Sequence, residues 1–200
     1  MLDHAFLVAV DSLRRSCREA MLDLEAGDER FQTDLLGGDL TWETTCALPG
    51  EGKPPRVRAD VTLDWPTWSQ TSYRTWRLDG ELDEPPELGI EVVLRVQDLA
   101  DEPDLAAVRA ALEPDGPELG PDRLHLTTPT LERAFDDELQ GRGWAVEFAY
   151  DGMLELTEAT LGDLDQLATA VAGLGPWLAS TLVRLGDLHL AFLPPEPGGR

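Results

Sequence analysis

The chain has 200 residues, the length of one ordinary domain or at most two small ones. Hydrophobic residues make up 42% and charged residues 28%, which excludes both a disordered tail and a membrane bundle. Acidic residues number 39 against 16 basic ones, for a net charge of -23. Because nucleic acids and anionic membranes are held by basic surfaces, we expect neither as a partner.

Few features of the chain bear on its compartment. The only two cysteines, Cys17 and Cys46, could pair only if the fold brought them together, and we expect reduced thiols in the cytoplasm. The apolar run 5–10 has no basic segment before it, so a secretory signal is not expected. The uncharged stretch 166–183 contains glycine, proline, serine and threonine, which favours a buried helix over a membrane span.

The first element is an amphipathic helix. Asp3 can cap its start and Gly27 can end it. Apolar residues recur between them at steps of three and four. These residues are Phe6, Val10, Leu13, Cys17, Met21 and Leu24.

From Gly38 the hydrophobic period changes to two, which predicts strands. Four alternating runs follow, over residues 40–48, 57–65, 68–78 and 90–96. They predict an antiparallel meander with one buried and one wet face, and the first helix has the stripe needed to cover the buried face.

Residues 79–122 hold fourteen acidic side chains against two basic ones and are rich in proline. We interpret this acidic block as loops around one strand and one short helix over residues 103–112, with proline in the first turn of that helix.

The second half of the chain predicts a short helix over residues 130–140, then strands over 144–150 and 154–156. Asp151-Gly152 between these strands is a strong hairpin signal. Thr160 and Asp163 can open a helix that Pro176 interrupts and that ends at Gly186. A last short strand over 188–192 precedes a Pro- and Gly-rich tail at 194–200.

These elements predict an α+β fold. An antiparallel sheet, made of a four-strand meander plus a C-terminal hairpin, packs against N-terminal and C-terminal helices. We expect a single domain over residues 1–200 with a flexible tail at 194–200. A boundary between two halves, 1–100 and 101–193, would fall within the acidic block.

The element order resembles the type III secretion chaperone-like fold, and in particular the YbjN-type family. The resemblance is closest over residues 131–185, where a short helix, a strand, the Asp151-Gly152 turn, a strand and a long helix follow each other. It covers about a quarter of the chain. The extra early strand, the extra helix and the kinked last helix depart from the family. The resemblance implies a small acidic dimer that binds proteins and catalyses nothing, and it carries over no residue.

The sequence contains no catalytic signature, so we expect no enzyme, no cofactor and no metal. His4, His125 and His189 are far apart and lack metal-ligand spacing, and we assign His125 and His189 to strand packing. The serines lie in no nucleophile motif, and Cys17 belongs to an apolar stripe. Acidic clusters such as 136–138 lack the glycine-containing loop of calcium sites.

Two groups of residues are candidates for binding a partner. Tryptophan and tyrosine rings in the meander are either core side chains or binding anchors. Arginines occupy the alternating polar positions of adjacent predicted strands. They either converge into a docking patch or form cross-strand ion pairs with carboxylates. The candidate residues are Trp42, Arg58, Trp68, Tyr73, Trp76, Arg77 and Arg95.

We therefore expect a non-catalytic, acidic protein-binding module, such as a chaperone, adaptor or regulator, whose partner is a basic protein. An immunity protein or antitoxin that neutralises a basic partner is a variant of this function. The alternatives are a small-ligand-binding protein or enzyme with an aromatic-lined pocket, and a nucleic-acid mimic built on the acidic block. We also expect a homodimer through a sheet edge or a helix face.

Overall fold

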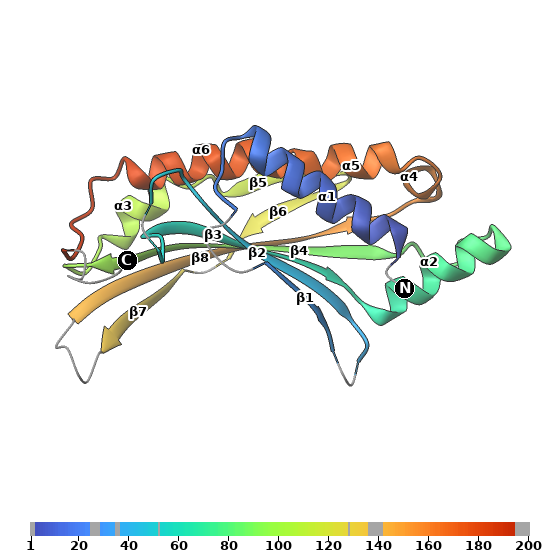
Figure 1. Ribbon diagram of the computed structural model, residues 1–200, viewed down its shortest axis with the longest axis horizontal. Helices are drawn as coiled ribbons and strands as arrows, with labels where there is room; N and C mark the ends of the chain where they lie inside the picture. Colours follow the sequence, from blue (N-terminus) through green and yellow to red (C-terminus); the bar gives the residue numbers. More distant parts are fainter. Residues whose placement is uncertain are drawn as a thin grey trace.

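The computed structural model describes residues 3–24, 29–34, 37–51, 53–127, 129–135 and 142–194. Over these residues the chain forms an eight-stranded antiparallel sheet with helices at both ends of the sequence, as expected for an α+β protein (Figure 1). In sheet order the strands are β1 (Arg30–Thr33), β2 (Leu40–Ala47), β3 (Val57–Trp65), β4 (Glu87–Leu99), β8 (Arg142–Glu155), β6 (Asp122–Leu126) and β5 (Asp115–Leu119), and β7 (Thr130–Phe135) also pairs with β8. Strands from both halves of the chain share this sheet, because β4 pairs with β8.

The centre of the sheet consists of β2 (Leu40–Ala47), β3 (Val57–Trp65), β4 (Glu87–Leu99) and β8 (Arg142–Glu155). Their apolar residues alternate with polar ones, so one face of each strand is buried. The register brings the apolar positions together, with Val61 opposite Val92 and Val92 opposite Tyr150. The predicted strands 40–48, 57–65 and 90–96 are therefore confirmed.

The buried face is covered by helices α1 (His4–Glu19), α5 (Leu164–Ala172) and α6 (Leu174–Gly186) (Figure 1). The expectation that the first helix covers the sheet is thus confirmed. Small residues allow these helices to approach closely. Ser12 donates a hydrogen bond to the Ala168 carbonyl at 2.7 Å, and a Cβ at Gly175 would collide with the backbone of Ser16.

The prediction of a strand over residues 68–78 is wrong, because this segment is helix α2 (Thr67–Asp79). Its buried residues Ser69, Gln70 and Tyr73 follow the helical period rather than the strand period. Pro66 lies at its N-cap, and Gly80 ends it in the left-handed conformation with a φ of 74°. The meander is accordingly interrupted by helix α2, which connects the end of β3 to the start of β4.

The predicted hairpin at Asp151-Gly152 is also wrong, because β8 runs through both residues without turning. β4 is 13 residues long and pairs with β8 on both sides of Gly152, so a continuous strand satisfies more backbone hydrogen bonds than a hairpin would. Gly152 is instead a place of close approach, since a Cβ there would lie 2.9 Å from the carbonyl oxygen of Arg123 on the neighbouring strand.

The predicted helix over 130–140 does not form at its start, where residues Thr130–Phe135 form strand β7; residues 136–140 lie outside the described part. The first half of β8 extends past β6, and β7 satisfies the backbone groups of that free edge. Within the acidic block, the short helix is α3 (Leu105–Ala110), capped by Asp104. Three strands were not predicted, namely β1 (Arg30–Thr33), β5 (Asp115–Leu119) and β6 (Asp122–Leu126).

The C-terminal helical region consists of α4, α5 and α6, whereas the sequence predicts one helix interrupted at Pro176. Thr157 caps a short α4 (Glu158–Gly162), and Asp163 caps α5 rather than completing a cap for Thr160. A break at Gly173 separates α5 from α6, which carries Pro176 in its first turn. By length and composition alone, the stretch 164–186 could cross a membrane, but here it packs on α1 and the sheet.

The ends of other predicted helices and strands differ from those in the structure or lie outside the described residues. Helix α1 ends at Glu19, so Met21 and Leu24 lie beyond it, and Gly27 is not described. The predicted strand 188–192 is reduced to a single bridge between Phe192 and Leu99. Of the tail 194–200, only Pro194 is described.

Candidate functional site

The most distinctive surface is the face of the sheet opposite the helices, here called the open face. In the described part of the chain no helix covers it, and β7 and the β1–β2 pair bend away from the helical layer at its two sides (Figure 1). Its residues are the polar positions of the central strands. They include Thr41, Glu43, Thr45, Arg58, Asp60, Thr62, Asp64, Glu91, Arg95, Gln97, Glu147 and Asp151.

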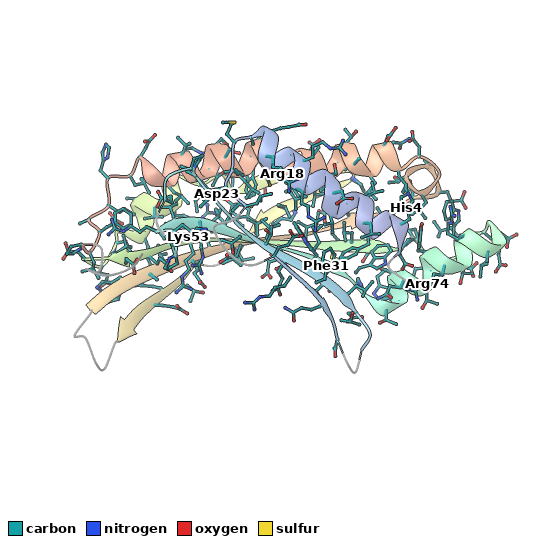
Figure 2. All side chains as sticks on the ribbon, in the orientation of Figure 1. His4, Arg18, Asp23, Phe31, Lys53 and Arg74 are labelled. Carbon is teal, nitrogen blue, oxygen red and sulfur yellow. The ribbon has the colours of Figure 1, made fainter. Side chains whose placement is uncertain are left out.

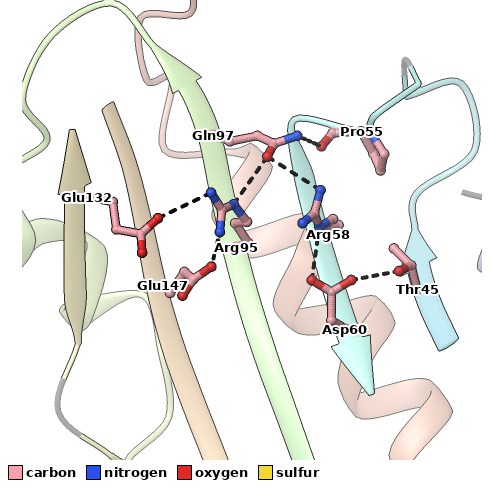
Figure 3. Close-up of polar contacts among 8 residues, drawn as sticks. All are labelled: Thr45, Pro55, Arg58, Asp60, Arg95, Gln97, Glu132 and Glu147. Atoms are coloured by element: carbon pink, nitrogen blue, oxygen red, sulfur yellow. Dashed lines mark hydrogen bonds and ion pairs between the residues drawn. The ribbon is translucent and has the colours of Figure 1, made fainter. Parts of the chain in front are cut away.

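Arg58 and Arg95, two of the predicted binding residues, meet on this face. They lie directly opposite each other on β3 and β4, and both donate hydrogen bonds to Oε1 of Gln97, at 3.4 and 3.2 Å (Figure 3). The Gln97 amide donates in turn to the Pro55 carbonyl at 2.9 Å. One glutamine therefore fixes the orientation of both arginines.

Carboxylates neutralise both arginines. Arg58 forms an ion pair with Asp60 at 3.0 Å, and Thr45 donates to the other oxygen of Asp60 at 2.7 Å (Figure 3). Arg95 forms ion pairs with Glu147 and, at 3.4 Å, with Glu132. The two arginines thus belong to an internal ion-pair network. Arg95 pairs with Glu147 across strands, as the cross-strand alternative predicted, whereas Arg58 pairs with Asp60 on its own strand. Neither arginine has uncompensated positive charge for an acidic partner.

The other end of the open face carries uncompensated negative charge. A hollow of about 420 Å³ lies there, with the side chains of Asp64, Glu91 and Asp151 in its lining. These residues come from three adjacent strands, and Glu91 is directly opposite Asp151. Gly89, opposite Asp64, adds no side chain to fill the space. Among the described residues, none of these three carboxylates forms an ion pair with an arginine or lysine. We call this set the acidic hollow.

The environment of Asp64 favours its neutral form. Partial burial, together with the nearby charge of Asp39, raises the pKa of Asp64, although a hydrogen bond from Thr41 at 3.1 Å opposes the rise. A cation placed in the acidic hollow would relieve this unfavourable charge, because an opposite charge nearby stabilises a carboxylate.

The predicted aromatic residues do not gather on the open face. Trp42 is completely buried beneath α1, and Tyr73 is buried at the inner side of α2, where its ring meets Trp65 edge to face at 6.2 Å. Trp76 packs against this core from α2 and is half-buried. Trp68 is 41% exposed, so it is the most accessible of the four predicted rings.

Arg77 does not join the other two predicted arginines, because it is exposed on α2 rather than on a strand. Its neighbour Arg74, labelled in Figure 2, forms an ion pair with Asp3 at 3.0 Å and helps to hold α2 against the start of α1. The predicted group of seven binding residues is therefore dispersed over the open face, the core and α2.

Arg14 has an environment that the sequence analysis missed. Its guanidinium lies 5.6 Å from the ring centres of both Phe31 and Trp42, and it forms an ion pair with Glu29. Phe31 is 46% exposed on β1 and is labelled in Figure 2. The arginine thus fastens the edge strand β1 to α1. A second hollow beside it is lined by three arginines and three carboxylates, so it has no net charge.

The histidines do not form a common site. His125 is exposed on β6, with Asp115 at 3.1 Å and Asp122 at 3.6 Å, so the expectation that it packs within the sheet is wrong. His4 begins α1. His189 is exposed after α6 and lies in no strand, so the expectation of strand packing is wrong for this residue too. Within the described ranges, no group of three or more histidine, cysteine or acidic side chains is arranged to hold a metal ion.

Neither described hollow is lined by a tryptophan, and Trp42 and Trp65 of the sheet are fully buried. The arrangement on the open face therefore suits recognition of charge on another molecule better than enclosure of an apolar ligand.

Comparisons with known proteins identify no relative: no family model, no curated protein and no solved structure matches the chain. The stretch on which the resemblance to secretion chaperones depends also folds differently from the expectation. It begins with a strand in place of a helix, and it lacks the turn at Asp151-Gly152.

Proposed function

We propose that the protein is a non-catalytic binding module that receives an arginine- or lysine-rich segment of a partner protein on its open face. The observation that carries this proposal is the acidic hollow, in which Asp64, Glu91 and Asp151 converge without a basic partner among the described residues. Such a partner would supply the missing positive charge.

The charge of the whole molecule supports the same class of partner. A net charge of -23 attracts basic proteins over long distances and repels acidic ones, so it increases the rate of encounter with a basic segment. The local carboxylates then determine where the segment docks. An antitoxin or immunity protein that neutralises a basic toxin would use the same face in the same way.

The shape of the open face favours an extended segment. Its strands present polar side chains in rows, and the flanking β1–β2 pair and β7 border it on both sides (Figure 1). At one end of the open face, Arg58 and Arg95 form ion pairs with carboxylates of this chain. Among the described residues, the carboxylates of the acidic hollow at the other end have no such partner and can accept an incoming basic side chain. This difference gives the bound segment a preferred position.

The test uses a fluorescently labelled peptide of alternating arginine and glycine, with a glutamate–glycine peptide as the negative control. Fluorescence anisotropy measures the affinity of each peptide for the full chain at low and at physiological salt. The decisive variant combines Asp64→Asn, Glu91→Gln and Asp151→Asn. We expect it to weaken binding of the basic peptide by about tenfold, or about 1.4 kcal/mol.

A matched variant removes three exposed carboxylates from the helical side, by Glu19→Gln, Asp165→Asn and Asp187→Asn. Both triple variants have the same net charge, so long-range attraction is reduced equally. If the open face is the docking site, the control variant binds within about twofold of the unmodified chain. Equal losses in both variants, or no binding of the basic peptide at all, would refute the proposal.

A further inference from the structure

The two cysteines of the chain, 29 positions apart in sequence, are neighbours in the core. The Sγ atoms of Cys17, in the last turn of α1, and Cys46, near the end of β2, are 4.0 Å apart. Both thiols are free, and neither side chain is exposed to solvent. The fold thus creates a contact that sequence spacing could not predict.

Backbone hydrogen bonds hold the segments that carry the two thiols. Immediately after α1, the Leu22 amide donates to the Cys17 carbonyl at 2.9 Å. Asp23 then exchanges two backbone hydrogen bonds with Ala47, the residue after Cys46, at 2.8 and 3.0 Å. The chain therefore closes a loop whose two ends are fixed beside each other, and the thiols remain neighbours whenever this bridge is formed.

We propose that Cys17 and Cys46 are a thiol-oxidation site, at which hydrogen peroxide converts the pair to an intramolecular disulfide that joins α1 to β2. A disulfide requires the sulfur atoms to approach to about 2.0 Å, so the Cys17 and Cys46 side chains must rotate toward each other or the segments that carry them must shift.

The reaction balances in two steps. Cys17 attacks one peroxide oxygen as its thiolate, and the O–O bond breaks. The hydroxide that leaves takes up the proton lost from the Cys17 thiol, so the products are a sulfenic acid on Cys17 and one water molecule. The Cys46 sulfur then attacks the Cys17 sulfur, the S–O bond breaks, and a second water leaves with the proton from Cys46. Two thiols are oxidised, and one peroxide is reduced to two molecules of water.

The geometry assigns the first step to Cys17. The Cys46 S–H group donates a hydrogen bond to the Cys17 sulfur, which lowers the pKa of Cys17. The same hydrogen bond and burial raise the pKa of Cys46 well above its usual value. Because the thiolate is the nucleophile, Cys17 attacks the oxidant and Cys46 resolves the sulfenic acid.

Burial determines which conditions favour the reaction. Both thiols are fully buried, so oxidation is slow in the closed structure and faster when the turn that carries Cys17 opens. Hydrogen peroxide is small enough to need only a minor opening. This predicts that a urea concentration well below the unfolding transition accelerates cross-linking.

The test treats the full, reduced chain with hydrogen peroxide, blocks remaining thiols under denaturing conditions, and measures the intact mass. We expect loss of two hydrogen atoms, no alkylation, and complete reversal by a reductant. Tryptic peptides should link the fragment containing Cys17 to the one containing Cys46. Two alkylatable thiols after treatment, over-oxidation of Cys17 alone, or only intermolecular dimers would overturn the proposal.

A second measurement follows stability. The cross-linked form should unfold about 5–10 °C higher than the reduced form, because the disulfide restricts the unfolded chain. The Cys17→Ala and Cys46→Ala variants should show no peroxide-dependent shift, and a shift of the same size in either would contradict the assignment. The mass measurement needs no variant, so its result stands even if a substitution prevents folding.

Discussion

Glu91 and Asp151 lie directly opposite each other on adjacent strands of the open face. Both are exposed acidic residues that line one hollow, and among the described residues neither has a basic partner. Like charges in directly opposed positions destabilise a sheet, so this pair costs stability. Such a cost is consistent with a surface kept for binding.

The first prediction concerns this pair. Glu91→Gln removes the repulsion, and we expect it to increase the free energy of unfolding in urea by about 0.2–1 kcal/mol at low salt. High salt should reduce the gain, because salt screens exposed charges. Glu102→Gln, at an exposed position outside the sheet, is the control and should have no measurable effect. A loss of stability in Glu91→Gln would contradict the repulsion.

The second prediction tests the path of β8. Gly152→Ala places a Cβ 2.9 Å from the Arg123 carbonyl, so β6 must shift, and we expect a loss of about 1–3 kcal/mol in urea unfolding. Gly186→Ala is the matched control, because nothing lies within 4 Å of its added Cβ. If Asp151-Gly152 formed an exposed turn instead, Gly152→Ala would not press on β6.

The third prediction concerns alkaline pH. Burial raises the pKa of Tyr150 to about 12, and its hydroxyl donates a hydrogen bond to the Glu113 carbonyl at 2.7 Å. The unfolded chain loses this proton near pH 10, so the folded state holds it more tightly between about pH 10 and 12. Stability contributed by the neutral tyrosine is present below pH 10 and is lost as the pH rises through this window.

Tyr150→Phe should remove this part of the alkaline loss. Urea unfolding at several pH values measures the slope in both proteins. The chain has a second tyrosine, Tyr73, so the difference in tyrosinate absorbance between the two proteins reports the ionisation of Tyr150. At neutral pH the variant should lose about 0.5–1.5 kcal/mol, the usual contribution of one hydrogen bond. An unchanged slope in the variant would show that other groups cause the alkaline loss.

The fourth prediction concerns the junction of α1, β3 and α2. Asp3 is buried and accepts hydrogen bonds from Trp65 Nε1 and Arg74 Nε, each at 3.0 Å. Asp3→Ala leaves the buried indole N–H without this acceptor, and we expect a loss of about 1–3 kcal/mol. His4→Ala, at the exposed next position, should lose much less in the same thermal or urea unfolding.

The fifth prediction separates core rings from accessible ones. Trp42 is fully buried, and its indole donates to Glu29 at 2.5 Å, so Trp42→Ala should cost about 3–5 kcal/mol. Trp76 is half-buried, so Trp76→Ala should reduce the free energy of unfolding by less than Trp42→Ala does. Trp68→Ala should cost less again, because 41% of that residue is exposed. An equal loss for Trp42→Ala and Trp68→Ala in urea unfolding would contradict these placements.

The wrong prediction of a hairpin at Asp151-Gly152 shows that a local turn signal can hide a longer hydrophobic pattern in the same sequence. The large apolar residues in and just after β8 share one parity, and a path without a turn places them against the core. They are Trp144, Val146, Phe148, Tyr150, Leu154 and Leu156. A two-residue turn at Asp151-Gly152 would have placed Leu154 and Tyr150 on opposite faces. The unbroken alternation of apolar residues therefore predicted the path of β8 better than the Asp-Gly dipeptide did.

The error at α2 has a similar cause. Large aromatic residues at positions 68, 73 and 76 suggested a strand, but the positions that are buried, Ser69, Gln70 and Tyr73, are mostly polar. Ser69 and Gln70 are buried because they hydrogen-bond backbone groups, including the carbonyls of Glu87 and Gly38 at 2.9 Å. A hydrophobic pattern cannot reveal a helix that is fixed through polar side chains.

Of the candidate site, the sequence indicated Arg58 and Arg95 on the polar face of a sheet, but it did not indicate the acidic hollow. Glu91 and Asp151 are 60 positions apart, and only the pairing of β4 with β8 places them opposite each other. The contact between Cys17 and Cys46 depends in the same way on how α1 crosses β2.

The amino-acid sequence by itself determined the acidic charge, the first helix, and which side of β2, β3 and β4 is buried, because these features follow from composition and local hydrophobic period. The tertiary structure alone decided the partners of each strand, the path of β8, the place of β7 and the meeting of the two thiols. These depend on backbone hydrogen bonds between distant segments, whose register a local pattern does not specify.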